Sequence, residues 1–554
     1  MSNGDHIEIV PLGGLGEFGM NTLAVRYGGA IVVIDAGLMF PRDDLLGVDI
    51  VVPDLSYLKE HAGEVRAVIL THGHEDHMGG LAFLLDEINA PVYGTPLTLG
   101  LARGRLQEHR ILDQADLRPI SPRERLYLEK FEIDFIGMTH SLANSVGLSI
   151  NTPLGRIIHT GDFKFDHSPP DRHLSDYSLL TQFGDEGVLA LLSDSTNSER
   201  TGYTPSEMQV AQTLEQIFRV STGKIIVACF ASSIHRIQIV INLAALVGRK
   251  VVPLGRSMVQ NIAIARELGY LSDSAGVLTT IHEGARLPSE RVLLLSSGSQ
   301  GEPMAALARL ALEKHKHFQV DPGDKVIISA RTIPGNESRI SHLINHFCRR
   351  GATVIDERSM LVHASGHASQ EELKWMLNLT RPTYFMPIHG EYRQLHRHAL
   401  LAQEAGIPRE RILIAETGDV VAVAPGIFEL RGRVPVGRRL IDEGGITELD
   451  ECVVRDRQQL SEEGVVLAVV AVDRATGEIE GAPEIVSRGH SQELAQTSLM
   501  AEAREVVRHM LQECSAEERS DQLLLAEMVR TELKRFFRKR TASRPMIVPV
   551  VLEI

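Results

Sequence analysis

The chain has 554 residues, of which 43% are hydrophobic and 23% are charged, and its formal net charge is −15. This length predicts roughly two to four domains, and the composition is that of an ordinary globular protein. The longest apolar runs, such as residues 465–472, have the length of a strand and are too short for a membrane span. Residues 1–5 lack the features of a signal peptide, and the four cysteines have no paired spacing, so we expect a cytoplasmic protein.

The first 200 residues are predicted to form short strands, with one helix over residues 79–88. Along the expected strands, apolar residues either alternate with polar ones or follow one another without interruption, and most of these strands end at or beside Gly, Asp or His. The expected strands are residues 7–10, 21–27, 30–35, 67–71, 91–94, 131–137, 147–152 and 155–159. The polar residues at the strand ends mark the edge where an α/β protein usually has its site.

From Ser206, an expected N-cap for a helix that runs toward Ser221, the pattern changes. Strands and helices then alternate, which predicts a parallel sheet with crossover helices. The strands are expected at 224–230, 250–254, 292–295 and 325–329, and the helices at 233–247, 257–268, 303–312 and 336–349. Strands return at 384–388 and 412–423, so this α/β domain is predicted to be inserted into the first one.

Residues 433–460 are rich in Gly, Arg, Asp and Glu and are predicted to form a linker. The tail is expected to contain a strand at 465–473, helices at 491–514 and 520–538, and a final strand at 546–552. We interpret the basic run 534–540 as the solvated face of a helix whose Phe residues pack inward; contact with nucleic acid is the alternative.

The run Thr71-His72-Gly73-His74-Glu75-Asp76-His77 directly follows an apolar strand. Its three imidazoles and the carboxylate of Asp76 are too close in sequence for a regular helix or strand to aim them at one point, whereas a loop can do so. Imidazole and carboxylate ligands suit zinc or manganese. The alternative is an exposed histidine-rich loop, but this spacing, followed by two glycines, favours metal binding.

Further ligands are expected at the ends of other strands. His140, Asp162 and His389 each follow an apolar strand, where a side chain can face a cleft. Each alone could be an ordinary surface residue, but together they can complete a two-metal centre. Asp162 is suited to bridge two cations, because a shared anion reduces their repulsion.

The glycines of Gly14-x-Gly16-x-x-Gly19 mimic a dinucleotide-binding fingerprint. That fingerprint requires a helix after the glycines. Residues 21–27 instead read as a strand, so we interpret the glycines as a turn that lines the metal site.

Together these motifs resemble the metallo-β-lactamase superfamily, and Asp194, His367 and His389 in this order resemble its β-CASP branch. The sequences of residues 70–77, 364–368 and 387–391 are similar to motifs of the bacterial ribonuclease J family. The resemblance to this family covers essentially the whole chain. The resemblance implies a metallo-β-lactamase αββα sandwich with an inserted β-CASP α/β domain and a small α+β C-terminal domain. The expected ranges are 1–205 and 366–432 for the first domain, 206–365 for the insertion, 433–460 for the linker and 461–554 for the C-terminal domain.

The resemblance also implies two divalent metal ions per chain, Zn²⁺ foremost, with Mn²⁺ or Mg²⁺ as alternatives. It assigns the first metal to His72, His74, His140 and Asp162, the second to Asp76, His77, Asp162 and His389, and a supporting role in the metal loop to Asp35. Asp194 and His367 are expected to form a catalytic pair that protonates the leaving oxygen. From the local sequence alone, Asp194 could instead be a turn-forming residue and His367 a supporting histidine in a Gly-Ser loop.

Several loops could bind phosphate. Ser233 lies where a strand passes into a helix, and small hydroxyl residues at a helix N-terminus form a natural phosphate site. The loop His363-Ala364-Ser365-Gly366, with His367, offers further donors, and 255–257 and 296–302 are similar. Any one could be an ordinary α/β loop; several beside a metal cleft suggest a channel for RNA, with Ser233 and 363–367 holding a 5′-phosphate.

The function implied by the resemblance is an RNA-processing and RNA-decay nuclease. It would act as a 5′→3′ exonuclease preferring 5′-monophosphorylated RNA and as an endonuclease, with a metal-bridging hydroxide attacking phosphorus to leave 5′-phosphate and 3′-hydroxyl ends. The net charge of −15 is a weak argument against RNA, because dications dominate the local field, and a histidine at 389 favours RNA over DNA.

The implied partners are single-stranded RNA, a second copy in a homodimer or tetramer, and proteins of an RNA-degradation complex, without a membrane. Two alternatives remain. A small-molecule metallo-hydrolase such as a lactonase or thioesterase is disfavoured by the large inserted domain. An inactive scaffold in RNA decay is disfavoured by the intact set of ligands.

Overall fold

The chain folds into two units in the computed structural model. The structure describes residues 6–41, 45–302, 304–333, 335–442, 447–473, 476, 478–489, 497–515, 518–519, 521–541 and 543–554. Met1–Phe40 and Val51–Arg439 form the first unit, and Pro41–Ile50 and Leu440–Ile554 form the second. The predicted ligands and the catalytic pair all lie in the first unit.

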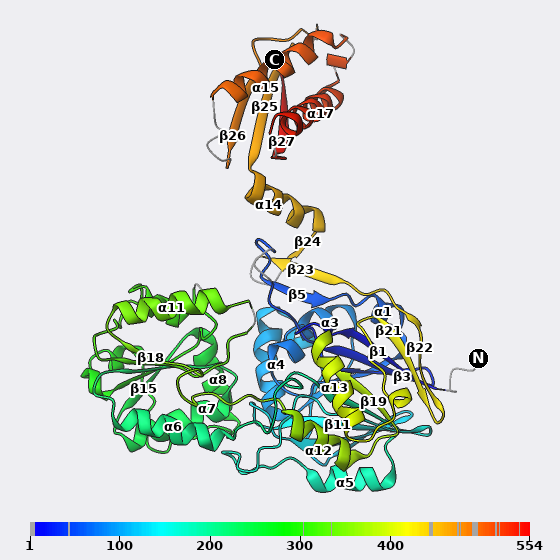
Figure 1. Ribbon diagram of the computed structural model, residues 1–554, viewed down its shortest axis with the longest axis vertical. Helices are drawn as coiled ribbons and strands as arrows, with labels where there is room; N and C mark the ends of the chain where they lie inside the picture. Colours follow the sequence, from blue (N-terminus) through cyan, green and yellow to red (C-terminus); the bar gives the residue numbers. More distant parts are fainter. Residues whose placement is uncertain are drawn as a thin grey trace. The chain divides into compact units, whose positions relative to one another are not determined.

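Two sheets stack face to face in the first unit (Figure 1). The eight-stranded sheet has the order β22-β21-β1-β3-β4-β6-β7-β8, and the six-stranded sheet has the order β19-β13-β12-β11-β10-β9. Alternate apolar residues on their inner faces, such as Val25 and Ile69 against Phe135 and Leu148, form one buried core. The strands of the first sheet are β1 (Ile7–Gly13), β3 (Thr22–Tyr27), β4 (Ala30–Ile34), β6 (Val65–Ile69), β7 (Val92–Gly94), β8 (Leu117–Pro119), β21 (Asp419–Ala424) and β22 (Ile427–Arg433). Those of the second are β9 (Arg125–Leu128), β10 (Phe131–Met138), β11 (Ser145–Thr152), β12 (Gly155–His159), β13 (Ala190–Asp194) and β19 (Tyr384–Ile388).

Helices cover the outer face of each sheet. α1 (Ser56–Glu60), α3 (Leu81–Glu87) and α4 (Pro96–Glu108) pack on the eight-stranded sheet. α5 (Tyr177–Glu186), α12 (Gln370–Thr380) and α13 (Tyr392–Glu404) pack on the six-stranded sheet. The result is the αββα sandwich implied by the resemblance.

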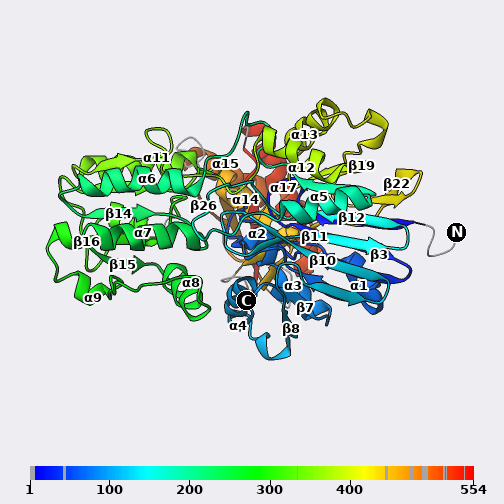
Figure 2. The same ribbon diagram turned by 90° about the horizontal axis from the view of Figure 1, so that it is seen from below.

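A parallel five-stranded sheet, in the order β15-β16-β14-β17-β18, forms the inserted domain beside the sandwich (Figure 2). Its strands are β14 (Ile225–Ala228), β15 (Lys250–Leu254), β16 (Val292–Ser296), β17 (Lys325–Ile328) and β18 (Thr353–Ile355). One face is covered by α6 (Glu207–Arg219), α7 (Ile234–Leu246) and α8 (Arg256–Glu267), the other by α9 (Ile281–Gly284), α10 (Ala306–Ala311) and α11 (Glu337–Arg349). The hydroxyl of Ser206 accepts a hydrogen bond from Met208 N at 3.1 Å, so the predicted N-cap of α6 is confirmed.

The second unit contains a smaller α+β domain. Its sheet has the order β26-β25-β27, and helices α15 (Thr497–Glu513) and α17 (Gln522–Arg540) pack on one face. The strands are β25 (Val465–Val472), β26 (Glu484–Arg488) and β27 (Met546–Glu553). Phe537, within the basic run of α17, is fully buried in this core, as expected for a helix whose Phe residues pack inward.

The remaining elements belong to none of these sheets or their covering helices. They are β2 (Leu15–Gly16), β5 (Ile50–Pro53), α2 (Glu75–Met78), β20 (Gly390–Glu391), β23 (Arg438–Asp442), β24 (Thr447–Leu449) and α14 (Glu451–Glu463), with 3₁₀ turns at Ala62–Glu64, Leu112–Gln114, Ser289–Arg291 and Arg409–Arg411. No helix among the described residues is long and apolar enough to cross a membrane.

Three local expectations differ from the structure. The range 433–460, expected to be an irregular linker, contains β23, β24 and most of α14, which begins where the side chain of Asp450 accepts from Cys452 N. The strand expected at 412–423 is confined to β21, because Gly418 turns the chain with a φ of +92° just before it. Residues 491–496 of an expected helix lie outside the described part of the chain, and α15 is described from Thr497.

Candidate metal centre

The histidine-rich run forms a loop after β6 that continues into α2, and Asp35 holds it in place. The carboxylate of Asp35 accepts hydrogen bonds from Thr71 N at 2.7 Å, from Thr71 Oγ1 at 2.9 Å and from His77 Nδ1 at 2.7 Å. Asp35 itself has a φ of +62°, which turns the chain at the end of β4. Because Nδ1 of His77 donates in this bond, Nε2 is the ring nitrogen that points toward the cluster.

A close backbone approach fixes the start of α2. A Cβ atom on Gly37 would lie 1.8 Å from the carbonyl oxygen of Asp76, so only glycine fits there. The same carbonyl accepts from Asn21 N at 3.0 Å, and His77 O accepts from Ala36 N at 2.7 Å. The segment after β4 and the start of β3 therefore set the positions of Asp76 and His77.

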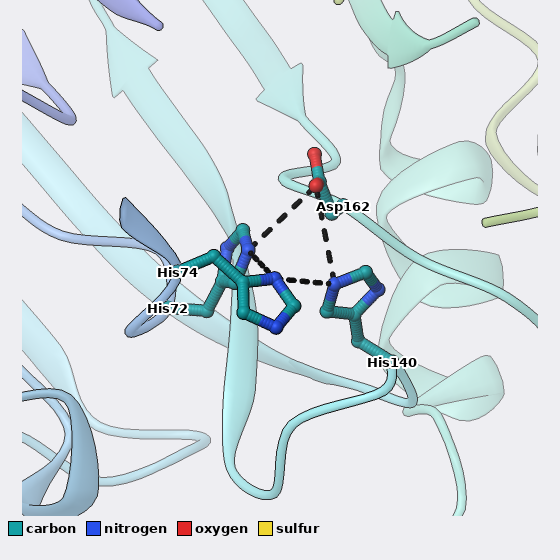
Figure 3. A group of neighbouring side chains, drawn as sticks. All are labelled: His72, His74, His140 and Asp162. Atoms are coloured by element: carbon teal, nitrogen blue, oxygen red, sulfur yellow. Dashed lines mark hydrogen bonds and ion pairs between the residues drawn. The ribbon is translucent and has the colours of Figure 1, made fainter. Parts of the chain in front are cut away.

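Three imidazole nitrogens without protons converge on one point beside Asp162 (Figure 3). His140 Nδ1 donates to Gly366 O at 2.8 Å, which leaves its Nε2 unprotonated. The hydroxyl of Thr71 already donates to Asp35, so its contact of 3.0 Å with His72 Nδ1 requires that nitrogen to donate and leaves Nε2 unprotonated. Neutral His74, whose Nε2 lies 3.3 Å from Ser141 Oγ, can present Nδ1 in the same way.

The spacing of these atoms matches a tetrahedral cation site. His74 Nδ1 lies 3.0 Å from His72 Nε2 and 3.1 Å from His140 Nε2. Asp162 Oδ2 lies 3.6 Å from His72 Nε2 and 3.9 Å from His140 Nε2. Zinc–nitrogen bonds of about 2.0–2.1 Å place the corners of a tetrahedron about 3.4 Å apart. Facing lone pairs at these distances repel one another unless a cation lies between them, so this group fits a divalent metal.

A second group shares Asp162 with the first. His77 Nε2 lies 3.2 Å from Asp162 Oδ2 and 3.5 Å from Asp76 Oδ2. His389 Nδ1 lies 2.9 Å from Asp162 Oδ1, and its Nε2 lies 3.5 Å from Asp76 Oδ2. His389 directly follows β19 with a φ of +54°, a turn that brings its ring back over the site. Asp162 Oδ2 thus faces nitrogens of both groups, and Asp162 Oδ1 faces His389.

The glycine-rich turn supports His389. Residues Leu15 and Gly16 of β2 pair in parallel with Gly390 and Glu391 of β20. The glycines are followed by the strand β3, as predicted, and Gly13 and Leu15 line the small cavity beside His77 and His389.

The protonation equilibria of the cluster favour a bound cation. Burial lowers the pKa of His72 and His140 far below the usual value and that of His74 to about 4, so these rings are neutral. Burial also acts on His77 and His389, but the charge of Asp162 outweighs it and raises the pKa of both well above the usual range. The carboxylates of Asp162 and Asp76 therefore favour a positive charge beside them, and a metal ion can supply it.

His367 and Asp194 stand at the side of the metal cluster. His367 Nδ1 lies 2.8 Å from Asp194 Oδ2, and Asp194 Oδ1 accepts from Thr196 N at 2.9 Å and from Thr196 Oγ1 at 2.7 Å. Burial lowers the pKa of His367, but the charges of Asp194 and Asp162 outweigh it and raise the pKa above the usual value. The His367 side chain is 20% exposed, whereas that of Asp194 is 1% exposed. The pair can hold a proton on His367 Nε2 beside the candidate ligands.

The residues of loop 363–366, which are predicted to bind phosphate, lie close to the metal cluster or are at least partly buried. Gly366 supports the metal cluster: its carbonyl accepts from His140, and a Cβ atom there would lie 2.5 Å from His140 Cε1. Ala364 is buried, and Ser365 Oγ accepts from Asn197 Nδ2 at 2.9 Å. Burial and the positive charge of Arg236 lower the pKa of His363 to about 3.

Ser233 precedes α7 as its N-cap residue, and its hydroxyl makes no capping hydrogen bond. Three residues later Arg236 donates to Val362 O at 2.8 Å, so the start of α7 lies against the segment that contains His363. The other loops predicted to bind phosphate, residues 255–257 and 296–302, lie at the carboxyl ends of β15 and β16 in the same sheet.

Several supporting residues were missed in the sequence. Asn21 contacts Asp76 and His77, His159 is buried beside Asp35 with its pKa lowered to about 4 by burial, and Asn197 donates to His367 O at 2.9 Å. The only sequence feature that could have indicated Ser141 and Asn197 as supporting residues is that each follows a predicted site residue closely.

The fold and the site define a metallo-hydrolase of the metallo-β-lactamase fold with an inserted β-CASP domain. Residues 15–228 match the family model of the metallo-beta-lactamase superfamily, and residues 352–413 match that of the Zn-dependent metallo-hydrolase RNA specificity domain. Residues 222–347 match "Ribonuclease J, beta-CASP domain", and residues 452–554 match "Ribonuclease J C-terminal domain".

Full-length relatives give the particular family. Ribonuclease J2 of Bacillus subtilis is 39% identical over 552 residues, covering 100% of this chain and 99% of that protein. Ribonuclease J of Thermus thermophilus is 43% identical over 99% of this chain and 96% of that protein. Ribonuclease J 1 of Streptococcus pyogenes is 41% identical over 99% and 98%, respectively. The chain belongs to the ribonuclease J family.

A solved structure shares the fold. A protein of unknown function from Enterococcus faecalis superposes with a TM-score of 0.53 at 13% sequence identity, covering 75% of this chain and 100% of that one. At this identity the similarity concerns the fold alone.

Replacing His389 by Ala should remove about one metal equivalent per chain and leave the first group intact, because His389 is a member of the second group and not of the first. The metal content of the purified variant is measured by inductively coupled plasma mass spectrometry, with circular dichroism as a check on folding. His173, whose side chain is 80% exposed, provides the control substitution His173→Ala. An unchanged metal content in His389→Ala would remove this residue from the ligand set.

Proposed function

We propose that this chain is a metal-dependent ribonuclease of the ribonuclease J type. The observation that supports this most directly is the cluster of His72, His74, His140 and Asp162 beside the hydrogen-bonded pair His367–Asp194, of which His367 is partly exposed. The relatives that align over the full length are named ribonuclease J, and the segment that contains His367 and His389 matches an RNA specificity domain. The substrate we propose is single-stranded RNA.

Two divalent ions would be held by the groups that share Asp162, the first by His72, His74, His140 and Asp162 and the second by Asp76, His77, Asp162 and His389. Zn²⁺ is the ion we propose, since imidazole and carboxylate ligands suit it, with Mn²⁺ as the rival. Such ions supply an activated water and neutralise charge on a phosphodiester.

The protein's own groups would position the substrate and move the proton. Asp194 holds His367 through Nδ1 and raises the pKa of the ring, so Nε2 can donate a proton to the leaving 3′ oxygen. Because water and not the ribose 2′-hydroxyl attacks, the products would be a 5′-phosphate and a 3′-hydroxyl. The same centre would serve 5′→3′ exonuclease and endonuclease cleavage.

Incubation of the metal-loaded protein with 5′-labelled monophosphorylated RNA, with and without chelator, tests the proposal. A lactone and a thioester are assayed in parallel. Chelator-sensitive release of nucleotides supports a ribonuclease; turnover of only the small esters would identify a small-molecule hydrolase, and no turnover at all would identify an inactive scaffold.

His367→Ala should slow RNA cleavage by about 10²–10⁴-fold without loss of metal, because it removes the proton donor and leaves the ligands in place. Single-turnover rates are compared on RNA and on a phosphodiester with an activated leaving group, which needs less protonation and should be affected less. Equal losses on both substrates would remove His367 from the role of general acid.

We also propose that Ser233 and the loop 363–366 hold the 5′-monophosphate. A monophosphate can be satisfied by hydroxyl and backbone donors, whereas a triphosphate would overfill a closed pocket in volume and charge. The hydroxyl of Ser233 makes no capping hydrogen bond, so it is available to donate to a phosphate.

Ser233→Ala should reduce exonuclease cleavage of 5′-monophosphorylated RNA more than internal cleavage, because only the former requires a bound 5′ end. Both activities are measured on 5′-monophosphate, 5′-triphosphate and 5′-hydroxyl RNA. Ser221→Ala, on the loop after α6 at the far end of the inserted sheet, is the matched control. Parallel losses on all three RNAs would mean that Ser233 supports the channel or the fold.

A homodimer or tetramer is also proposed, with the second unit providing the contact. The face of its sheet that is turned away from α15 and α17 is apolar: Leu467 pairs with Val486 and Val548, and Leu552 at the end of β27 is 48% exposed. An apolar sheet face of this kind is typical of a protein–protein interface.

Leu467→Lys combined with Val548→Lys should weaken self-association, because it places two charges on this face, and removal of residues after 450 should do the same. Oligomeric mass is measured by multi-angle light scattering. Leu523→Lys changes a residue that is 85% exposed on α17 and is the matched control. An unchanged mass in the double variant and in the truncated chain would contradict the dimerising role.

A further inference from the structure

Arg331 is a half-buried arginine that forms no ion pair within the described part of the chain. It lies in the segment that follows β17, and its guanidinium donates to Asn197 Oδ1 at 2.9 Å. Among the described residues, no carboxylate lies within ion-pair distance of Arg331 or of its neighbour Arg200. Burial and the positive charges of Arg200 and Arg393 lower the pKa of Arg331, and together they outweigh the opposing charge of Glu357. An unpaired cation in this setting is costly unless an anion binds to it.

The loop that contains Arg331 is ordered by its neighbours. Gln300 Nε2 donates to Arg331 O at 2.9 Å, and Gln300 Oε1 accepts from Ile333 N at 2.9 Å. Gln300 is 5% exposed and follows β16, so it joins the loops at the carboxyl ends of two parallel strands. The guanidinium therefore stands on a rigid support, as a preformed binding group requires.

This loop lies where the connections of the inserted sheet change side. β14 and β17 are adjacent and parallel, but α7 after β14 packs on one face of the sheet and α11 after β17 packs on the other. The loops at their carboxyl ends therefore diverge, and open α/β sheets bind ligands beyond the carboxyl ends of their strands at such a point. Ser233 is in the loop after β14 and Arg331 is in the loop after β17, so both loops border this point.

A short chain of hydrogen bonds joins Arg331 to the catalytic pair. Asn197, which accepts from Arg331, donates through Nδ2 to Ser365 Oγ and to His367 O, both at 2.9 Å. Asn197 is 2% exposed, so its amide is fixed by these partners. An anion on Arg331 would thus be bound two hydrogen bonds away from the backbone of His367.

We propose that Arg331, assisted by Arg200, binds one phosphodiester of the RNA backbone between the 5′-end pocket and the metal centre, and that Asn197 couples this contact to the position of His367. The inference rests on the proposed ribonuclease function. The ligand is one internal phosphate of a single strand, which a guanidinium can bind through two parallel hydrogen bonds. Arg331 is in this sense both a substrate-binding residue and, through Asn197, a positioning residue.

The test compares Arg331→Gln and Arg331→Lys with the metal-loaded wild-type protein. Single-turnover cleavage of a 5′-monophosphorylated RNA gives the half-saturating protein concentration and the maximal rate at several salt concentrations. Arg331→Gln should raise the half-saturating concentration about 10- to 100-fold and reduce the magnitude of its salt slope by about 0.7, the value for one phosphate of a single strand. Arg331→Lys keeps the charge and should restore the salt slope. Arg219→Gln, which removes an exposed arginine paired with Glu215, should change neither.

A set of RNAs, each with one methylphosphonate linkage, identifies the phosphate. At one linkage the loss of charge should weaken wild-type binding about as much as Arg331→Gln does, and should cost the variant nothing more. Additive losses at every linkage, or a reduced maximal rate with unchanged half-saturation and salt slope, would overturn the proposal and leave Arg331 a structural support of Asn197. If the wild-type protein cleaves no RNA, the proposed function fails, and fluorescence anisotropy with the then intact RNA tests the phosphate contact separately.

Discussion

The position of Asp162 between two groups of imidazoles is the constraint on which the site depends. Each of the three sets of potential metal ligands in the described residues includes this carboxylate. It follows β12 through Gly161, whose φ of +57° turns the chain at the strand end, so one short turn places the carboxylate that the candidate groups share. The hydrogen bonds of Asp35, Gly366 and Ser141 then decide which nitrogen of each ring faces Asp162. The fold thus determines the protonation state of the ligands as well as their positions.

The grouping of the predicted ligands was foreseeable from the sequence because most of them follow the end of a strand. Apolar runs before His140, Asp162 and His389 indicated that the following side chains face a common edge, and the spacing of residues 72–77 indicated a loop. The tautomers were not predictable, because they depend on contacts between distant segments, such as Gly366 with His140. Asn197 was missed for the same reason: its role is visible only once His367, from another part of the chain, lies beside it.

Some helices were not predicted because their own sequences lack a clear helical pattern. α4 begins with Pro96 and contains Gly100 and Gly104, which weaken any helical pattern. Both glycines face side chains of α8: a Cβ atom on Gly100 would lie 2.8 Å from Leu268, and one on Gly104 would lie 2.6 Å from Gln260. They are explained by the close packing of the sandwich against the inserted domain. α14 was hidden by its high content of charged residues, which resembles that of a linker.

The order of the ligands along the chain has a consequence for biosynthesis. His72, His74, Asp76 and His77 are made early, but His389 follows the whole inserted domain, and the carbonyl of Gly366 that fixes His140 is also made after it. A nascent chain that has not yet released β19 from the ribosome lacks His389, the last of the proposed ligands. A nuclease that acts on RNA would therefore acquire its complete centre only after most of its own message has been translated, and prematurely terminated products would lack the proposed centre.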